Sequence, residues 1–160
     1  MFQFQSKLDP DLFEAMLRHD EGVRLRVYDD ATGEPIGPGS VVKGNPTIGV
    51  GRNVGPTGPG LRQDEVDSML MRDISAYEAQ AETFDWYLHL NAVRATVVCA
   101  MIFNMGLRTF STFTGLIAAI GAQDFEKASA EMLASEWAKQ VGERATRLAE
   151  MMRLGVPIQR

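Results

Sequence analysis

The residues best suited to chemistry lie between positions 19 and 54. Glu21 stands where a helical pattern gives way to a strand-like run, and Asp29 and Asp30 follow that run in a turn. Thr47 opens a second strand-like run, TIGVG. A carboxylic acid facing a carboxylate and a hydroxyl is the arrangement that breaks a glycosidic bond. The acid protonates the leaving oxygen, and the carboxylate stabilises positive charge or activates water.

Each of these residues also has an ordinary structural interpretation. Asp is a common turn former, so one of Asp29 and Asp30 can bind the local backbone while the other faces a cleft. A helix C-terminus disfavours an anion, and this field helps to keep Glu21 protonated, as a general acid must be. The order of a Glu at a helix end, a strand, an Asp turn and a Thr at the next strand favours catalysis over these interpretations.

The composition indicates one globular domain. The chain has 160 residues, of which 45% are hydrophobic and 23% charged, so it can bury a sizeable core. A net charge of −5 argues against a general nucleic-acid binder. No apolar run approaches the roughly 20 residues that span a bilayer, and the N-terminus does not read as a secretory signal. We therefore expect a protein made in the cytoplasm that does not insert into membranes.

The expected elements place the chemistry-bearing residues at the edge of a small sheet. A capping acid followed by proline opens a helix over residues 9–20, and residues 24–28 and 47–51 read as strands joined by a Gly- and Pro-rich loop at 33–45. Further helices are predicted over residues 62–81, 92–105, 113–120, 124–134, 135–140 and 143–154. The fold class is therefore α+β and mostly helical. Residues 22–61 form a small β-hairpin lobe, residues 62–81 a linking helix, and residues 82–160 with helix 9–20 a helical lobe.

The chain resembles the phage-type lysozymes, the T4-like endolysin muramidases. The matching segments are DEGVRLRVYDDATG, TIGVGRN, LRQDEVDSMLMRDISAYEAQ, FNMG and EWAKQVGERATRLAEMMRLG. They follow one another in the family's order and cover most of the chain from residue 12 to residue 155. The resemblance implies a lysozyme-like fold and cleavage of the β-1,4 bond between N-acetylmuramic acid and N-acetylglucosamine in peptidoglycan, with no metal or cofactor.

The resemblance also implies catalytic roles. The Glu of the family's DEG motif is the general acid and falls on Glu21. The catalytic Asp falls on Asp30 in preference to Asp29, and the Thr that positions the attacking water falls on Thr47. The implied reaction inverts the anomeric carbon, with Asp30 and Thr47 holding water on the face opposite Glu21.

Three other positions acquire roles by the same comparison. Arg144 matches the family Arg that pairs with the catalytic Glu near the cleft. Phe103 and Asn104 belong to the helix that floors the cleft and are expected to contact the sugars. A cation beside Glu21 lowers the pKa of the acid while burial raises it, so the sign of the net shift stays open.

Three features depart from the family pattern. Many relatives have His after Gly-x-Gly, paired with an Asp of the linking helix; here the positions hold Arg52 and Asp73, for which we expect a structural ion pair. The loop at 33–45 replaces a tight turn and brings Lys43 and Asn45 near the glycan or its peptide stems. The acidic net charge means that binding to an anionic wall relies on local contacts.

The expected setting is a monomeric phage endolysin that lyses its host. Without a secretory signal it needs a separate membrane-permeabilising protein to reach the wall in the periplasm; a virion-associated lysozyme is equally compatible. A lytic transglycosylase, which cuts the same bond with one Glu and leaves an anhydro product, is an alternative that the Asp30–Thr47 pair disfavours. A wall-binding protein without activity is another, which the intact Glu21, Asp30 and Thr47 disfavour.

Overall fold

The chain divides into two units within one long helix. The computed structural model describes residues 15, 17–20 and 22–158. Contacts separate Met1–Val66 from Asp67–Arg160, and the boundary falls inside α2 (Gln63–Ala81). Residues 17–20, at the end of the predicted helix 9–20, are helical. The greater part of that helix and Glu21 lie outside the described residues.

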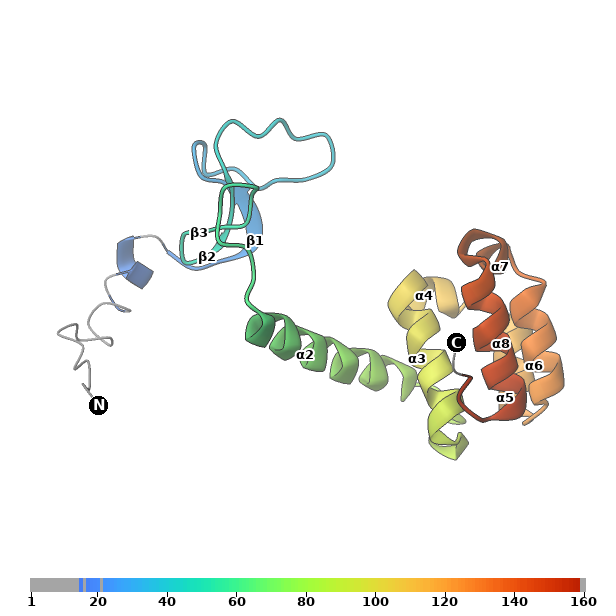
Figure 1. Cartoon of the computed structure of the whole chain (residues 1–160). Coiled ribbons are helices and arrows are strands. Elements are labelled where there is room, and N and C mark those ends of the chain that lie inside the picture. Colours follow the sequence, from blue (N-terminus) through green and yellow to red (C-terminus); the bar gives the residue numbers. More distant parts are fainter. Residues whose placement is uncertain (1–14, 16, 21, 159–160) are drawn as a thin grey trace. The chain divides into compact units, whose positions relative to one another are not determined.

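The first unit contains a three-stranded antiparallel sheet in the order β1–β2–β3 (Figure 1). The strands are β1 (Arg24–Asp29), β2 (Pro46–Gly49) and β3 (Arg52–Asn53). Tyr28 pairs with Thr47, and Asp29 pairs with Pro46. The last residues of β1 therefore lie directly opposite the first residues of β2, which brings the Asp turn beside Thr47.

The long loop between β1 and β2 folds back along β1. The Ile36 N–H donates to the Val27 carbonyl at 3.0 Å, and the Asp29 N–H donates to the Glu34 carbonyl at 2.9 Å. The predicted hairpin loop thus has backbone pairing of its own, and its later residues return to β2 past the Asp turn.

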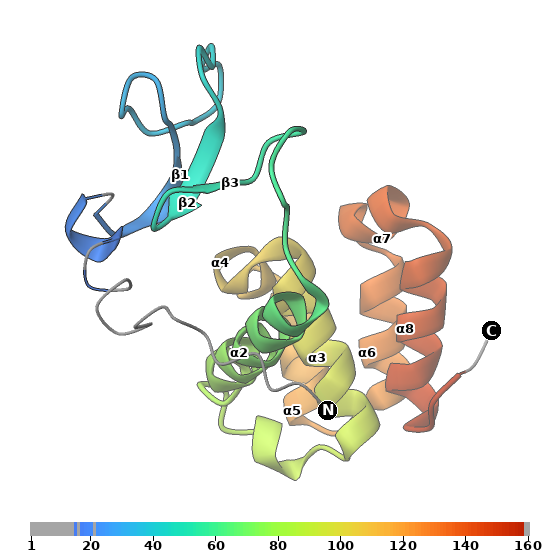
Figure 2. The ribbon, with the colours of Figure 1, turned by 60° about the vertical axis from the view of Figure 1, so that its left-hand side comes forward.

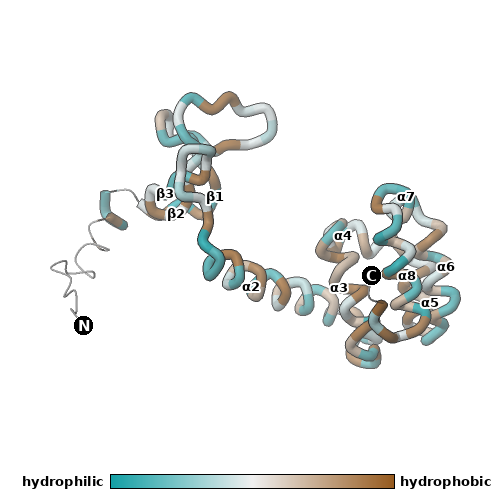
Figure 3. Tube along the Cα trace, viewed as in Figure 1, coloured by the Kyte–Doolittle hydropathy of each residue, from teal (hydrophilic) through white to brown (hydrophobic). Residues whose placement is uncertain are grey.

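Helix α2 is amphipathic. Its colours alternate between hydrophilic and hydrophobic along the tube in Figure 3. Leu70, Ile74 and Tyr77 recur at helical spacing and belong to one face. Asp64 and Glu65 lie in the first turn, where acidic side chains complement the helix dipole.

The second unit is a bundle of helices. After the short 3-10 helix η1 (Tyr87–His89) come α3 (Ala92–Met105), α4 (Leu107–Phe110), α5 (Thr114–Gly121), α6 (Phe125–Leu133), α7 (Glu136–Val141) and α8 (Glu143–Leu154). Helix α8 packs against α3, α6 and α7, and α6 also packs against α5. Helices α6 and α8 lie side by side in both views of the ribbon (Figures 1 and 2).

Helix α3 supplies the centre of this bundle's core. Val97, Val98, Met101 and Ile102 are completely buried, as the almost wholly apolar sequence of the helix predicts. Phe110 of α4 is also completely buried. Other buried core residues are Ala81, Tyr87, Leu116, Ala119, Ile120, Ala128, Met132, Trp137, Ala145, Leu148, Ala149 and Met152.

The start of α3 binds the end of α8. Asn91 caps α3 by accepting the Arg94 N–H at 3.0 Å, and its Nδ2 donates to the Gly155 carbonyl at 2.9 Å. The Arg94 guanidinium donates to the Met152 and Arg153 carbonyls at 2.8 and 3.0 Å. These bonds satisfy carbonyl groups that a helix C-terminus leaves unpaired.

The predicted α+β, mostly helical fold class is confirmed, and the helices over residues 92–105 and 143–154 have the predicted bounds. The assignment of the helix at 9–20 to the helical lobe stays a prediction. Every helix within the described residues is too short or too polar to span a bilayer.

Candidate functional site

Asp29 holds the turn together. Its carboxylate accepts backbone N–H groups from Ala31, Lys43 and Gly44 at 3.0, 2.6 and 2.9 Å, and the side chain is buried, with 4% exposed. The N–H of Lys43, and then those of Ala31 and Gly44, lower the pKa of Asp29 against the opposing effect of desolvation. With its oxygens occupied by the backbone, Asp29 is the structural member of the Asp pair.

Asp30 is the exposed member of the pair. Its Oδ1 accepts the Asn45 backbone N–H at 2.6 Å, and its Oδ2 accepts the Asn45 Nδ2 at 3.0 Å. These two bonds, the backbone bond first, lower the pKa of Asp30, although desolvation and the nearby Asp29 charge raise it. The carboxylate is therefore ionised at neutral pH and open to solvent, as a base or charge stabiliser must be.

Thr47 lies beside this pair and is almost fully buried, with 3% exposed. Its hydroxyl donates to the Asn45 carbonyl at 3.1 Å. Asn45 thus contacts both Asp30 and Thr47 and joins these two predicted site residues. The sequence placed Asn45 near the glycan but gave no sign of this role, because an Asn in a Gly/Pro-rich loop is an ordinary turn residue.

The backbone at Gly44 passes so close to Asp30 and Ala31 that this position has no room for a side chain. A Cβ on Gly44 would lie 2.1 Å from Asp30 Oδ1 and 2.8 Å from the Ala31 backbone N. We expect Gly44→Ala to displace Asp30 and to lower catalytic activity about 10- to 100-fold, since misplacement of about 1 Å costs rates of this order. Gly37→Ala is the matched control, because a Cβ there meets nothing within 4 Å. Equal activities of the two variants would contradict this geometry.

Acid titration provides a test of the role of Asp29. A group whose pKa is lowered by folding stabilises the folded state above its ordinary pKa, here 3.8, and this contribution is lost as the pH falls through the lowered value. We expect the NMR amide signals of Lys43 and Gly44 to titrate with a midpoint below 3.8. In Asp29→Asn this transition should be absent. A midpoint at or above 3.8 would show that these N–H groups do not bind the carboxylate in solution.

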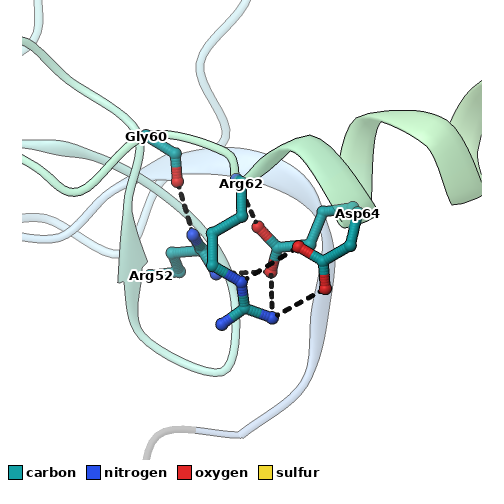
Figure 4. A network of polar contacts seen from close by, with 5 residues as sticks. Arg52, Gly60, Arg62 and Asp64 are labelled. Carbon is teal, nitrogen blue, oxygen red and sulfur yellow. Dashed lines mark hydrogen bonds and ion pairs between the residues drawn. The ribbon is translucent and has the colours of Figure 1, made fainter.

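Arg52 binds two partners within the first unit. The guanidinium binds Glu65 Oε1 at 2.6 Å and donates twice to the Gly60 carbonyl, at 2.8 and 2.6 Å (Figure 4). The pairing of Arg52 with Asp73 stays a prediction. Glu65 is the third residue of α2, and its Oε2 accepts the Arg62 N–H at 2.8 Å, half of a capping box. The capping geometry directs the Glu65 carboxylate back toward β3, where it meets Arg52.

The hydrogen bonds of Arg52 connect β3 to Gly60 and to the first turn of α2. Their loss should therefore lower the stability of the fold and leave the catalytic activity unchanged. We expect Arg52→Ala to lower the free energy of unfolding by about 1 kcal/mol, the usual worth of a partly buried ion pair with hydrogen bonds. Thermal unfolding and activity assays check this result. Arg62→Ala removes the exposed Arg62–Asp64 pair and a longer 3.9 Å contact to Glu65 but leaves the Arg52–Glu65 pair in place, so as the control it should cost less. An unchanged melting temperature in Arg52→Ala would contradict the assignment.

The second unit has a cavity of its own, of about 610 Å³, which Phe103, Arg144 and Asp73 line together. Its walls are mainly apolar side chains of α2 and α3. Phe103 meets Tyr77 edge to face, with ring centroids 5.1 Å apart, yet 55% of its side chain is exposed. Phe103 therefore keeps a free apolar surface on which a ligand can pack.

Asn104 is oriented by Trp137. The buried indole Nε1–H donates to Asn104 Oδ1 at 2.7 Å. Because an indole nitrogen only donates, the amide must turn its oxygen inward and its NH2 group outward. Local sequence patterns do not reveal this bond, because 33 residues separate the two partners.

The structure thus groups Asp30 and Thr47 in the first unit, and Phe103, Arg144 and Asp73 in the second. Glu21, the predicted acid, lies outside the described residues. Within the described part of the chain, no group of three or more His, Cys, Asp or Glu side chains is arranged to hold a metal ion.

Comparison with known proteins identifies similar sequences along almost the whole chain. The family model described as phage lysozyme matches residues 18–152. The pre-baseplate central spike protein Gp5 of Enterobacteria phage T4 is 28% identical over 157 residues, which are 88% of this chain and 27% of that protein. Probable T4-type lysozyme 1 of Dictyostelium discoideum is 24% identical over 92% of its own length. An endolysin of Acyrthosiphon pisum secondary endosymbiont phage 1 is 26% identical over 81% of this chain and 80% of its own.

Proposed function

Because the chain belongs to the phage lysozyme family, we propose that it hydrolyses peptidoglycan at the β-1,4 bond between N-acetylmuramic acid and N-acetylglucosamine. The observation that carries the proposal is that the two aspartates differ in their hydrogen-bond partners and in their exposure. The Asp29 carboxylate accepts hydrogen bonds from backbone N–H groups. Asp30 is exposed and ionised, and Asn45 connects it to Thr47 through hydrogen bonds. A glycosidase that uses water needs a carboxylate of this kind beside a group that orients the water.

The proposed reaction is a single displacement. Glu21 donates its proton to the glycosidic oxygen as the bond to the anomeric carbon breaks. A water molecule attacks that carbon from the opposite face and gives up a proton to Asp30, while Thr47 holds the water in place. The products are an alcohol on one sugar and an inverted reducing end on the other.

Three residues of the second unit are proposed to bind the glycan. Phe103 offers its exposed ring to a sugar face, and Asn104 offers its outward NH2 group to an acceptor oxygen. Arg144, which lines the same cavity as Phe103, is proposed to bind the glycan through its guanidinium. No cofactor enters this scheme.

The proposed setting is the bacterial cell wall. A free endolysin would reach the wall after a separate protein has permeabilised the membrane and would then lyse the host. The chain spans 27% of the T4 spike protein, and this relative supports a second setting, in which the same activity belongs to a virion component. In both settings the chemistry is the same.

Release of reducing sugars from purified peptidoglycan tests the proposal. We expect the wild-type chain to solubilise the polymer with one new reducing group for each bond cut. Binding without release would support a wall-binding protein, and solubilisation without new reducing groups would support a lytic transglycosylase. Either result would overturn the proposal.

A further inference from the structure

Asn45 contacts both first-unit residues that act on water in the proposed function. Its backbone N–H and its Nδ2 bind the two oxygens of the Asp30 carboxylate, at 2.6 and 3.0 Å. Its carbonyl accepts the Thr47 hydroxyl at 3.1 Å. The Asp30 N–H returns a bond to the same carbonyl at 3.1 Å. One residue of the long loop thus fixes the positions of both groups.

The orientation of the Asn45 amide is itself fixed. The Thr57 hydroxyl donates to Asn45 Oδ1 at 3.3 Å, and Asn53 Nδ2 donates to the Thr57 oxygen at 3.3 Å. An amide NH2 only donates and an amide oxygen only accepts. The chain of bonds therefore runs in one direction, from Asn53 through Thr57 and Asn45 to Asp30, and Nδ2 points at the carboxylate.

We propose that Asn45 is the positioning residue of the site and presents Asp30 and Thr47 together as two acceptors for one water molecule. The inference rests on the proposed function. The Thr47 hydroxyl donates its hydrogen to the Asn45 carbonyl. Its oxygen can therefore only accept a hydrogen bond from a further partner. A water that donates one hydrogen to Asp30 and the other to Thr47 keeps a lone pair for the anomeric carbon. As the new C–O bond forms, the proton passes to Asp30.

The charges around Asp30 give this role a pH signature. Asp29 is a like charge that raises the pKa of Asp30, whereas the two Asn45 N–H groups lower it. Lys43 lies next to Asp29 and acts on that carboxylate. Loss of the Asn45 side-chain donor should therefore raise the pKa of Asp30, and a carboxylate in place of the amide should raise it further.

Asn45→Ala and Asn45→Asp test the proposal. We expect kcat to fall about 10-fold in the first and about 100-fold in the second, with KM within about threefold of wild type, since general-base catalysis is worth 10²–10⁴-fold and depends on position. The acid limb of the pH profile of kcat/KM should move to higher pH in the order wild type, Asn45→Ala, Asn45→Asp. A merely structural role would not produce this order.

Ser40→Ala is the control, because it removes the bond from the Gly37 N–H within the same loop but leaves Asp30 untouched. NMR titration of the Asp30 carboxyl checks the pKa order in the free protein, whether or not it is active. An unmoved acid limb and an unmoved titration in both Asn45 variants would overturn the inference. So would a higher KM at unchanged kcat, which would make Asn45 a sugar ligand. Failure of the proposed function is distinguishable, because the wild type itself would then release no reducing ends.

Discussion

Replacement of Asp30 by asparagine is expected to lower the rate of peptidoglycan cleavage by about 10³-fold, within the range that a general base contributes. The asparagine keeps the size of the side chain but loses the charge that takes up the proton of water. The carboxylate is exposed and its pKa is lowered by Asn45, so the wild-type group is ionised at neutral pH. Initial rates of reducing-sugar release measure the effect.

Asp29→Asn is the matched comparison for Asp30→Asn. Asp29 accepts three backbone N–H groups, so its replacement should loosen the loop and lower the melting temperature. Its activity at low temperature should stay well above that of Asp30→Asn. If instead Asp29→Asn loses the activity and Asp30→Asn retains it, the base lies one residue earlier than we propose.

Replacement of Glu21 by glutamine is expected to reduce cleavage by roughly 10³-fold or more, because an amide cannot protonate the leaving oxygen. This prediction rests on the DEG motif and on membership of the family. The change preserves side-chain volume, so circular dichroism and the melting temperature should match the wild type. Full activity in a folded Glu21→Gln protein would refute the assignment of the acid.

The sequence predicted those helices in which a regular apolar pattern continues for several turns. The nearly apolar stretch of α3 and the capped, periodic stretch of α8 predicted their bounds to the residue. The four-residue helix α4 and the two-residue strand β3 were missed, because segments of this length carry no periodicity to detect.

The contacts of the candidate site residues could not be predicted from the sequence. Asp29 and Asp30 are adjacent and chemically identical, and their different contacts arise where Lys43 and Gly44 return past the turn and bind Asp29. Asn45 acquires its role because the loop closes at that point. In the same way, Arg52 binds Glu65, because a helix-capping carboxylate points back toward the sheet. Such contacts depend on how a loop closes, which local sequence patterns do not specify.

The central claim is hydrolysis of one particular bond, and mass spectrometry of the fragments from purified peptidoglycan tests it most directly. The account predicts muropeptides that end in reducing N-acetylmuramic acid from the wild-type chain, and none above background from Glu21→Gln. Anhydro ends, reducing N-acetylglucosamine ends, or the same fragments from both proteins would contradict it.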